Sequence, residues 1–313
     1  MVTMQHTHKK KTTWNTIKNQ KYLLLMSMPF VVWVIIFAYI PIWGWIMAFQ
    51  NYKPSANSNI FQQKWVGLKH FKDMFADPQF YRALQNTLGM SILGIVFGFI
   101  ITILFALFLN EVKNIFFKRV VQTFSYLPHF VSWVIAASIV IEMLSHGGIV
   151  NSLLMKWGLI SAPIQFFAKP GYFWWIVTFA TIWKDLGWNA IIYLSAISGI
   201  DPALYEAATV DGANRFRRIW HVTLPGIMPT VTIMLILSIG SILSVGFERQ
   251  MLLGNTLLLD KADVLDWYIL REGISSLRYS YGTAVGIFKS VVSIAMVLGA
   301  NFISKKYTDN GVV

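Results

Sequence analysis

Six long apolar segments alternate with shorter polar ones along the chain. They cover residues 22–49, 88–109, 123–144, 172–198, 226–247 and 284–303. A helix that crosses the hydrocarbon core of a membrane needs about 20 apolar residues, and each segment is long enough. Because backbone groups in lipid must hydrogen-bond to one another, each segment predicts a helix rather than an open strand. The pattern therefore predicts an all-α integral membrane protein with six transmembrane helices.

The composition supports a membrane environment and excludes several kinds of site. Hydrophobic residues make up 56% of the chain and charged residues only 13%. A soluble domain usually carries about 25% charged residues. The chain contains no cysteine, so it cannot form a disulfide, a thiolate metal site or a cysteine nucleophile.

The basic residues predict an orientation. In a membrane protein the formal charge of +12 points first to cytoplasmic loops, where Lys and Arg are enriched. Five lysines precede the first apolar segment: Lys9, Lys10, Lys11, Lys18 and Lys21. That segment is too long for a cleaved signal peptide. We therefore expect a cytoplasmic N-terminal segment (1–21), a membrane domain (22–303) and a cytoplasmic C-terminal tail (304–313).

Two of the apolar segments contain residues that affect helix shape. Pro41 and Gly44 predict a kink or an early exit near the outer end of the first segment. Gly94 and Gly98 in the second segment have the spacing that permits close helix contact, and we expect ordinary helix packing there.

The polar segment 199–225 predicts two short helices joined by a glycine. Asp201 is a suitable N-cap and Pro202 a suitable first helical residue. Residues 203–210 favour a helix, Gly212 breaks it, and residues 213–220 predict a second helix. The loop has more apolar side chains than it can shield by itself. It is therefore either a re-entrant cap on the bundle or a projection that docks into a groove on a partner.

Three motifs in this loop have the residues and spacing of a known family: Glu206-Ala207-Ala208, Asp211-Gly212-Ala213 and Leu224-Pro225. They resemble the EAA loop of the permeases of binding-protein-dependent ABC importers. The rest of the chain resembles the maltose-permease type of sugar permease, with Met28-Pro29-Phe30 in the first segment and Tyr279-Ser280-Tyr281 before the last. This likeness indicates the branch that handles polysaccharide-derived oligosaccharides, such as those of alginate or pectin.

The resemblance implies a fold, a location and partners. It implies the type I ABC importer fold in a bacterial inner membrane, beside a second, related permease. It implies an ABC ATPase dimer that binds ATP-Mg, an extracytoplasmic solute-binding protein, and no cofactor on this chain. Glu206 would pair with a basic group of the ATPase, Gly212 would form the bend, and the other motif residues would complete the coupling site: Ala207, Ala208, Asp211, Ala213, Leu224 and Pro225.

The sequence does not favour an enzyme. A phosphate-binding loop needs Gly-x-x-x-x-Gly-Lys-Ser/Thr, and the stretch from Gly282 to Ser290 has the wrong spacing. Glu142 and His146 are four residues apart and could share a helix face, but an interfacial polar pair is a simpler interpretation than a metal site. An ion-coupled carrier or a passive channel is the alternative class. Carriers tend to have paired interrupted helices in corresponding halves, and no such symmetry is evident.

Two lysines within apolar segments suggest a route for acidic sugars. Ionisable residues at membrane depth are costly and usually functional, and Lys184 lies near the middle of its segment. In the related branch glutamine is more common at the position of Lys289, so a cation there would suit a uronate. The structural alternative is that both lysines bond to other helices. Four further residues are candidates for stacking on sugars or bonding to their hydroxyls: Trp183, Trp188, Asn189 and Tyr193.

The long outer segment 248–283 predicts a short helix at residues 262–271, ended by Gly273. The segment mixes acidic and basic side chains, which fits a solvated cap. The family resemblance suggests instead a surface that meets the solute-binding protein, together with residues 51–85.

Overall fold

The computed structural model describes residues 18–54 and 60–308. Lys9, Lys10 and Lys11 lie outside the described residues. Within the described residues the fold is built from helices, with one isolated antiparallel bridge between Gln50 and Trp65 and no strand. The all-α prediction is confirmed.

Long helices form the body of the molecule. They are α2 (Lys21–Val34) with its continuations η1 (Ile35–Tyr39) and η2 (Ile40–Phe49), α4 (Pro78–Glu111), α5 (Ile115–Phe130), α8 (Pro170–Ser198), α10 (Arg215–Arg218) with η5 (Ile219–Thr223) and α11 (Leu224–Gly240), and α15 (Tyr279–Thr308).

Short helices connect the long ones. They are η3 (Ile60–Gln62), α3 (Lys69–Ala76), α6 (Trp133–Met143), α7 (Ile149–Lys156), η4 (Phe166–Ala168), α9 (Pro202–Val210), α12 (Glu248–Leu253), η6 (Thr256–Leu258), α13 (Leu259–Ala262), α14 (Leu265–Tyr268) and η7 (Ile269–Ser275).

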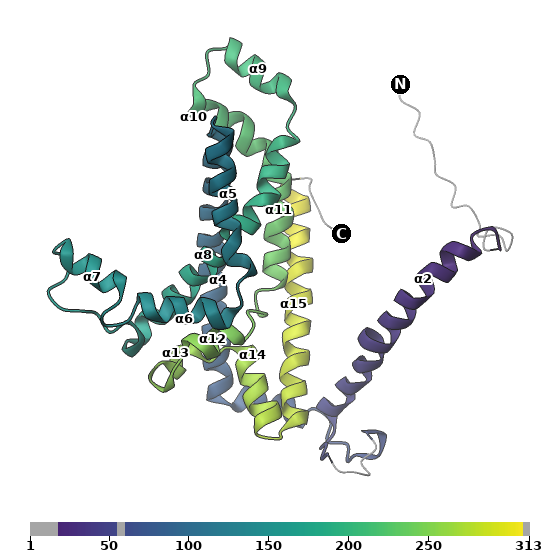
Figure 1. The fold of residues 1–313 in the computed structure, drawn as a ribbon. Coiled ribbons are helices and arrows are strands. Elements are labelled where there is room, and N and C mark those ends of the chain that lie inside the picture. Colours follow the sequence, from purple (N-terminus) through teal and green to yellow (C-terminus); the bar gives the residue numbers. More distant parts are fainter. Residues whose placement is uncertain (1–17, 55–59, 309–313) are drawn as a thin grey trace.

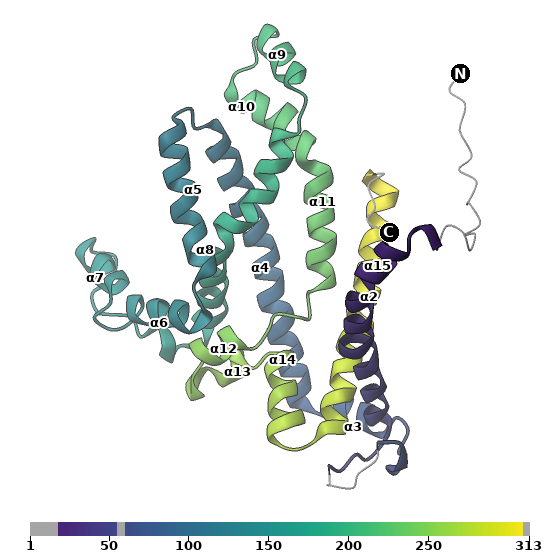
Figure 2. The same ribbon diagram turned by 45° about the vertical axis from the view of Figure 1, so that its right-hand side comes forward.

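The two ends of the bundle are different. Figures 1 and 2 show α4, α5, α8, α11 and α15 running between them, with α9 projecting from one end. Helices α6, α12, α13 and α14 gather at the other end. No residue of α2 is buried, and the chain returns to the bundle where η2 packs against α15. The helix changes to π and 3-10 turns around Pro41, which agrees with the predicted irregularity.

Length and composition identify four helices that can each cross a membrane, among the described residues. They are Lys21–Phe49, Pro78–Glu111, Arg215–Gly240 and Tyr279–Lys306, and a bent pair of helices makes a fifth candidate. Helix α8 has 29 residues but does not meet the same hydropathy test, because polar residues and tryptophans interrupt it. Six spans remain the expected number.

The third predicted helix, 123–144, is wrong in its course. Helix α5 begins at Ile115 and ends at Phe130, and α6 leaves at an angle of 108°. Pro128 occupies the last turn of α5, and Val131 is extended. The Ser132 hydroxyl then accepts a hydrogen bond from the backbone N–H of Ile135 and begins α6.

The other boundaries differ less. Helix α4 begins at Pro78, ten residues before the apolar segment, because Asp77 caps it through the Gln79 N–H. Helix α11 ends at Gly240 rather than near residue 247. The helix predicted at 262–271 is divided at Asp263, and its second part continues through Gly273 to Ser275. Gly273 is not a cap; it packs against Gly282 of α15.

Three buried clusters hold the bundle together. One joins α4, α14 and α15 at the end opposite α9, around Phe80, Tyr268 and Val285. A second joins α8 to α13, around Phe173. The third joins α4, α8 and α11 near the other end, around Tyr193 and Ile227. The last cluster places the helices on either side of the projecting loop in direct contact.

Candidate functional site

The projecting loop is built by local signals that its sequence contains. The Asp201 carboxylate accepts a hydrogen bond from the Ala203 N–H at 2.9 Å and caps α9, whose first residue is Pro202. Gly212 has a φ of +72°, the left-handed conformation that ends many helices. The Ala213 N–H then bonds back to the Ala208 carbonyl at 2.9 Å. The predicted glycine bend is confirmed.

The second arm of the loop differs from the prediction. Residues 213–220 do not form a separate helix, because α10, η5 and α11 continue without a break from Arg215 to Gly240. A π turn precedes Pro225, which cannot donate a hydrogen bond. The loop therefore consists of one separate short helix, α9, and the first turns of the long helix that begins at Arg215.

Side-chain contacts join the two arms into one unit. The Tyr205 hydroxyl lies 3.0 Å from the Thr223 hydroxyl, and Arg218 donates to Thr209 at 3.3 Å. At the base, Ile200 packs so closely on Gly226 that a Cβ there would overlap its side chain. A force on the loop is therefore applied to the ends of both α8 and α11.

The surface of the loop is open and apolar. Among its large apolar side chains, Val210 is 89% exposed, Phe216 77% and Leu204 54%. No residue of α9 is buried, so the loop projects instead of covering the bundle as a re-entrant cap. Glu206 is exposed and makes no ion pair with any described residue. Exposed apolar groups beside an unpaired carboxylate form a surface of the kind that meets a partner.

The structure divides the predicted coupling residues into two groups. Those on the projection are exposed or half-buried: Glu206, Ala207, Ala208, Asp211, Gly212 and Ala213. Leu224 and Pro225 lie at the start of α11 instead. Leu224 packs against the cluster that contains Tyr193 and Ile227. It therefore joins the base of the loop to the interior of the bundle.

A polar cavity of about 280 Å³ lies between α4, α8 and α11, and α12 closes one side. Apolar side chains, among them Met90, Phe99 and Met234, line part of it. The rest is lined by small and polar residues: Ser91, Gly94, Gly98, Thr102, Thr178, Thr181, Asn189, Tyr193, Ser238, Ser241, Ser244 and Arg249. A Cβ at Gly94 or Gly98 would meet no atom within 4 Å. These glycines thus open space in the cavity, and the close helix contact that their spacing permits is not formed.

Several polar groups of this cavity lack a protein partner. The Thr178 hydroxyl is buried without a hydrogen bond, and the Asn189 amide has none to any described residue. Buried polar groups are nearly always satisfied, so an unsatisfied hydroxyl in a cavity suggests a bound ligand or water. Among the sequence candidates, Asn189 and Tyr193 line this cavity.

Lys184 is placed at the bend between α5 and α6. It is 6% exposed, and its Nζ donates to the His129 carbonyl at 2.6 Å. The neighbouring Asp185 carboxylate lies 2.9 Å from His129 Nδ1, and the Trp188 ring stacks on the imidazole with centroids 4.6 Å apart. Lys184 and Trp188 therefore hold the end of α5 against α8, as the structural alternative describes for Lys184.

The other two candidates also lie outside the polar cavity. Trp183 lines an apolar groove between α6 and α8, beside Ile139 and Trp175. Lys289 forms an ion pair with Asp266, whose other oxygen accepts the Gly246 N–H at 2.7 Å. Lys289 thus connects α15 to α14 and to the turn before α12.

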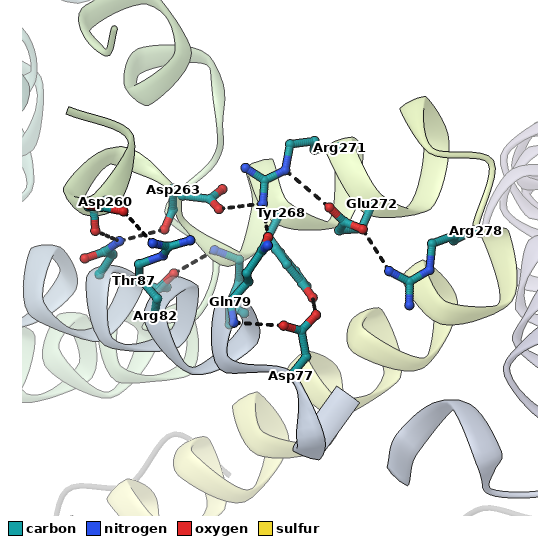
Figure 3. Close-up of polar contacts among 12 residues, drawn as sticks. Asp77, Gln79, Arg82, Thr87, Asp260, Asp263, Tyr268, Arg271, Glu272 and Arg278 are labelled. Atoms are coloured by element: carbon teal, nitrogen blue, oxygen red, sulfur yellow. Dashed lines mark hydrogen bonds and ion pairs between the residues drawn. The ribbon is translucent and has the colours of Figure 1, made fainter. Parts of the chain in front are cut away.

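A network of ion pairs and hydrogen bonds fixes the end of the bundle opposite α9 (Figure 3). Arg271 pairs with the buried Asp263 at 2.8 Å and with Glu272, and Glu272 pairs with Arg278 at 2.9 Å. Asp77 accepts the Tyr268 hydroxyl at 2.6 Å. These contacts attach the start of α4 to the outer helices.

Burial and hydrogen bonding have opposite effects on the pKa values of the carboxyl groups in this network. Burial alone would raise the pKa of Asp77, but hydrogen bonds from Tyr268, the Gln79 N–H and Tyr281, with the charge of Arg278, give a net lowering. For Asp263, burial dominates and the pKa is raised despite the guanidinium of Arg271. The carboxylates of Asp77 and Asp263 are bonded to other side chains of the fold, and they do not form a catalytic arrangement.

No metal site is found in the part of the chain that the structure describes. No group of three or more His, Asp or Glu side chains is placed to hold an ion there. Helix α6 ends at Met143, so Glu142 and His146 do not share a helix face.

Sequence reasoning identified only Asn189 and Tyr193 of the cavity lining, and Thr178 and Arg249 are among the residues that it missed. Arg249 follows the fifth apolar segment by two residues, so it was counted with the outer loop. Its proximity to α8 depends on the turn at residues 241–247. Gly246, with a φ of +74°, is a local signal for a turn there, but it does not determine the direction that the chain takes afterwards. A basic residue directly after a membrane segment is the only sequence signal that could have identified Arg249.

Comparison with known proteins identifies relatives over nearly the whole chain. The family described as "Binding-protein-dependent transport system inner membrane component" matches residues 94–308. Protein LplB of Bacillus subtilis (strain 168) is 43% identical, over 94% of this chain and 92% of that protein. The polygalacturonan/rhamnogalacturonan transport system permease protein YteP of the same organism is 41% identical, over 97% of this chain and 94% of its own length.

Two solved structures are also similar. One is a bacterial ABC transporter involved in the import of the acidic polysaccharide alginate, with a TM-score of 0.85 and 42% identity over 94% of this chain and 99% of that chain. The other is a bacterial alginate ABC transporter in complex with an alginate pentasaccharide-bound periplasmic protein. It has a TM-score of 0.87 and 42% identity, over 96% of this chain and all of that chain. The predicted resemblance to sugar permeases and the predicted importer fold are confirmed.

Proposed function

Since the chain belongs to the family of binding-protein-dependent transport system inner membrane components, we propose that it forms half of the membrane pathway of an ATP-driven importer of acidic oligosaccharides. The chain is a permease of a sugar importer of this kind. The proposal concerns its substrate, its partners and the way it is coupled to ATP.

The substrate is an oligosaccharide that contains uronate. Polygalacturonan, named for YteP, and alginate, named for the two solved structures, are both polymers of sugar acids. The polar cavity supports this assignment, because hydroxyl and amide groups without protein partners suit the hydroxyls of a sugar.

The partners are a second permease, two ATPase subunits and a solute-binding protein. The polar cavity of this chain has a volume of only about 280 Å³, so a second permease would complete the pathway. The chain contains no phosphate-binding loop, so ATP-Mg would be bound by the ATPase subunits. The binding protein would meet the end of the molecule that contains α12, α13 and α14, as the periplasmic protein of the alginate system supports.

Coupling depends on the projecting loop, and its geometry is the observation that carries the proposal. The loop would enter a cleft of the ATPase with Leu204 and Val210 buried there and Glu206 paired with a basic group. Both arms lead directly into helices that line the polar cavity, α8 and α11. A movement of the ATPase would therefore shift α8 and α11 together and change the side on which the cavity opens. ATP supplies the different contacts that such a two-state change requires.

ATP hydrolysis by the assembled complex tests the function. A complex with the second permease, the ATPase and the binding protein, in lipid vesicles, should hydrolyse ATP several-fold faster when the binding protein carries a galacturonate or alginate trisaccharide. The empty binding protein is the control. Uptake of sugar that continues without ATP would instead indicate an ion-coupled carrier or a passive channel.

In the proposed orientation in the membrane, the loop, the N-terminus and the C-terminus lie in the cytoplasm. The start of α2 and the end of α15 point toward the end from which α9 projects, which supports this arrangement (Figure 1). The absence of cysteine permits a clean test with single cysteines in place of Val210 and Leu257. A membrane-impermeant maleimide should label Val210→Cys only from the cytoplasm and Leu257→Cys only from outside. The reverse labelling would contradict the orientation.

A further inference from the structure

We infer that Arg249 binds the carboxylate of the transported sugar, and so makes the cavity selective for uronates. The inference rests on the proposed function and names the chemical feature that this site recognises. Arg249 is in α12, which closes one side of the polar cavity, and its side chain is among those that line it. The Nη1 of Arg249 donates to the Thr181 hydroxyl of α8 at 3.1 Å.

Arg249 differs from Lys289 in having no carboxylate within ion-pair distance among the described residues. Lys289 is paired with Asp266, and Lys184 is bonded to the His129 carbonyl with Asp185 as its neighbour in sequence. Within the described residues, no carboxylate oxygen lies within 4 Å of the Arg249 guanidinium, and Glu248 is exposed and forms no ion pair. Asp185 and Asp266 act on Arg249 at longer range, but their carboxylates are bonded to His129 and Lys289 instead.

A half-buried guanidinium without an anion costs free energy unless a ligand or another group supplies the missing charge and hydrogen-bond acceptors. Arg249 has five N–H donors. Its Nη1 donates to the Thr181 hydroxyl, and its Nε donates at 3.2 Å to the Gln250 side-chain oxygen when that amide is oriented to satisfy its neighbours. Its guanidinium carbon lies 6.0 Å from the centre of the Trp133 ring, which limits the directions it can take. The remaining donors form the fork that binds a carboxylate through two parallel hydrogen bonds.

The groups around Arg249 suit the rest of a sugar acid. The unpartnered Thr178 hydroxyl and the Asn189 amide line the same cavity on α8. They can bond to ring hydroxyls while Arg249 holds the acid group. The site thus provides a cation for the carboxylate of a uronate and neutral hydrogen-bonding groups for its hydroxyls.

Uptake by the full complex with two matched sugars tests the assignment. The probes are galacturonate trisaccharide and galactotriose, which differ in their carboxylates, and alginate trisaccharide is a second acidic probe. Arg249→Gln should lower the ratio of acidic to neutral uptake by about 10- to 100-fold, since a charge-assisted pair is replaced by neutral hydrogen bonds. Arg249→Lys should keep part of the preference. Lys289→Gln should leave the ratio as in the wild type, because Lys289 is already paired with Asp266.

The outcomes separate this inference from the proposed function. If the Arg249→Gln complex imports galacturonate as selectively as the wild type, the inference is wrong and the proposed function stands. If the wild-type complex imports neither acidic trisaccharide, the proposed function is wrong and the inference falls with it. Should Arg249→Gln fail to assemble, Thr178→Val and Arg249→Lys decide. The site is supported if Thr178→Val has reduced affinity for both galacturonate trisaccharide and galactotriose while Arg249→Lys retains the preference for the acidic sugar. The site is wrong if Thr178→Val takes up both sugars as the wild type does.

Discussion

Replacing Gly187 with alanine is expected to destabilise the permease strongly, by about 3 kcal/mol or more. Gly187 is where α8 crosses α5. A Cβ there would overlap the carbonyl group of Ser125 and lie 2.7 Å from the ring of Tyr126. The obstacle is backbone, which cannot rotate away as a side chain can. The two helices must therefore separate.

Separation of the helices would also break the polar contacts that hold the bend. Lys184 would lose the His129 carbonyl at 2.6 Å, and Asp185 would move from His129 Nδ1. A buried ammonium group that loses its only hydrogen-bond acceptor adds about 1.5–3 kcal/mol to the cost. The thermal stability of the purified complex and its yield from membranes measure the effect.

Gly286→Ala is the matched control for this change. Gly286 is also within a long helix, α15, but a Cβ there meets no atom within 4 Å. We expect the Gly286→Ala variant to be as stable as the wild type or slightly more stable, since alanine favours a helix over glycine by about 1 kcal/mol. If the Gly187 and Gly286 variants were equally stable, the close crossing of α5 and α8 would be incorrect.

Leu204→Asp is expected to separate the permease from its ATPase. Leu204 is 54% exposed on α9, and in the proposed assembly this apolar face is buried in a cleft. Loss of a buried leucine anchor with insertion of a carboxylate costs about 2 kcal/mol or more, which weakens binding by about 30-fold or more. Copurification of the ATPase subunits and ATP hydrolysis stimulated by the binding protein should both be lost.

The control is Leu257→Asp, the same change at the opposite end. Leu257 is 68% exposed and lies in η6, directly before α13. Helix α13 lies toward the opposite end of the bundle from α9 (Figure 1). This variant should retain its ATPase subunits. Normal recovery of ATPase with Leu204→Asp would mean that α9 does not provide the docking surface.

The local parts of this molecule could be read from its sequence. Asp201, Pro202 and Gly212 act through the backbone within a few residues, so the start of α9 and the bend after it were predictable. The apolar segments predicted helices for the same reason, since lipid requires each segment to satisfy its own backbone. The proposed coupling residues follow from motif spacing within one loop.

The roles of the charged residues required the tertiary structure. Lys184, Lys289 and Arg249 are all cations near membrane segments, and the sequence offers no way to tell which has a partner. That difference depends on His129, Asp266 and other groups far along the chain. For this reason the two lysines that the sequence favoured are bonded within the protein, and the arginine that it overlooked faces the cavity.

The sequence by itself determined that this chain is a helical membrane permease with a projecting loop, because hydrophobic length, helix caps and a glycine bend are local properties. Only the tertiary structure decided the 108° bend after α5, the polar cavity and the unpaired guanidinium beside it. Each of these results from side chains of different helices meeting, and the energy of such a contact depends on neighbours that are distant in sequence.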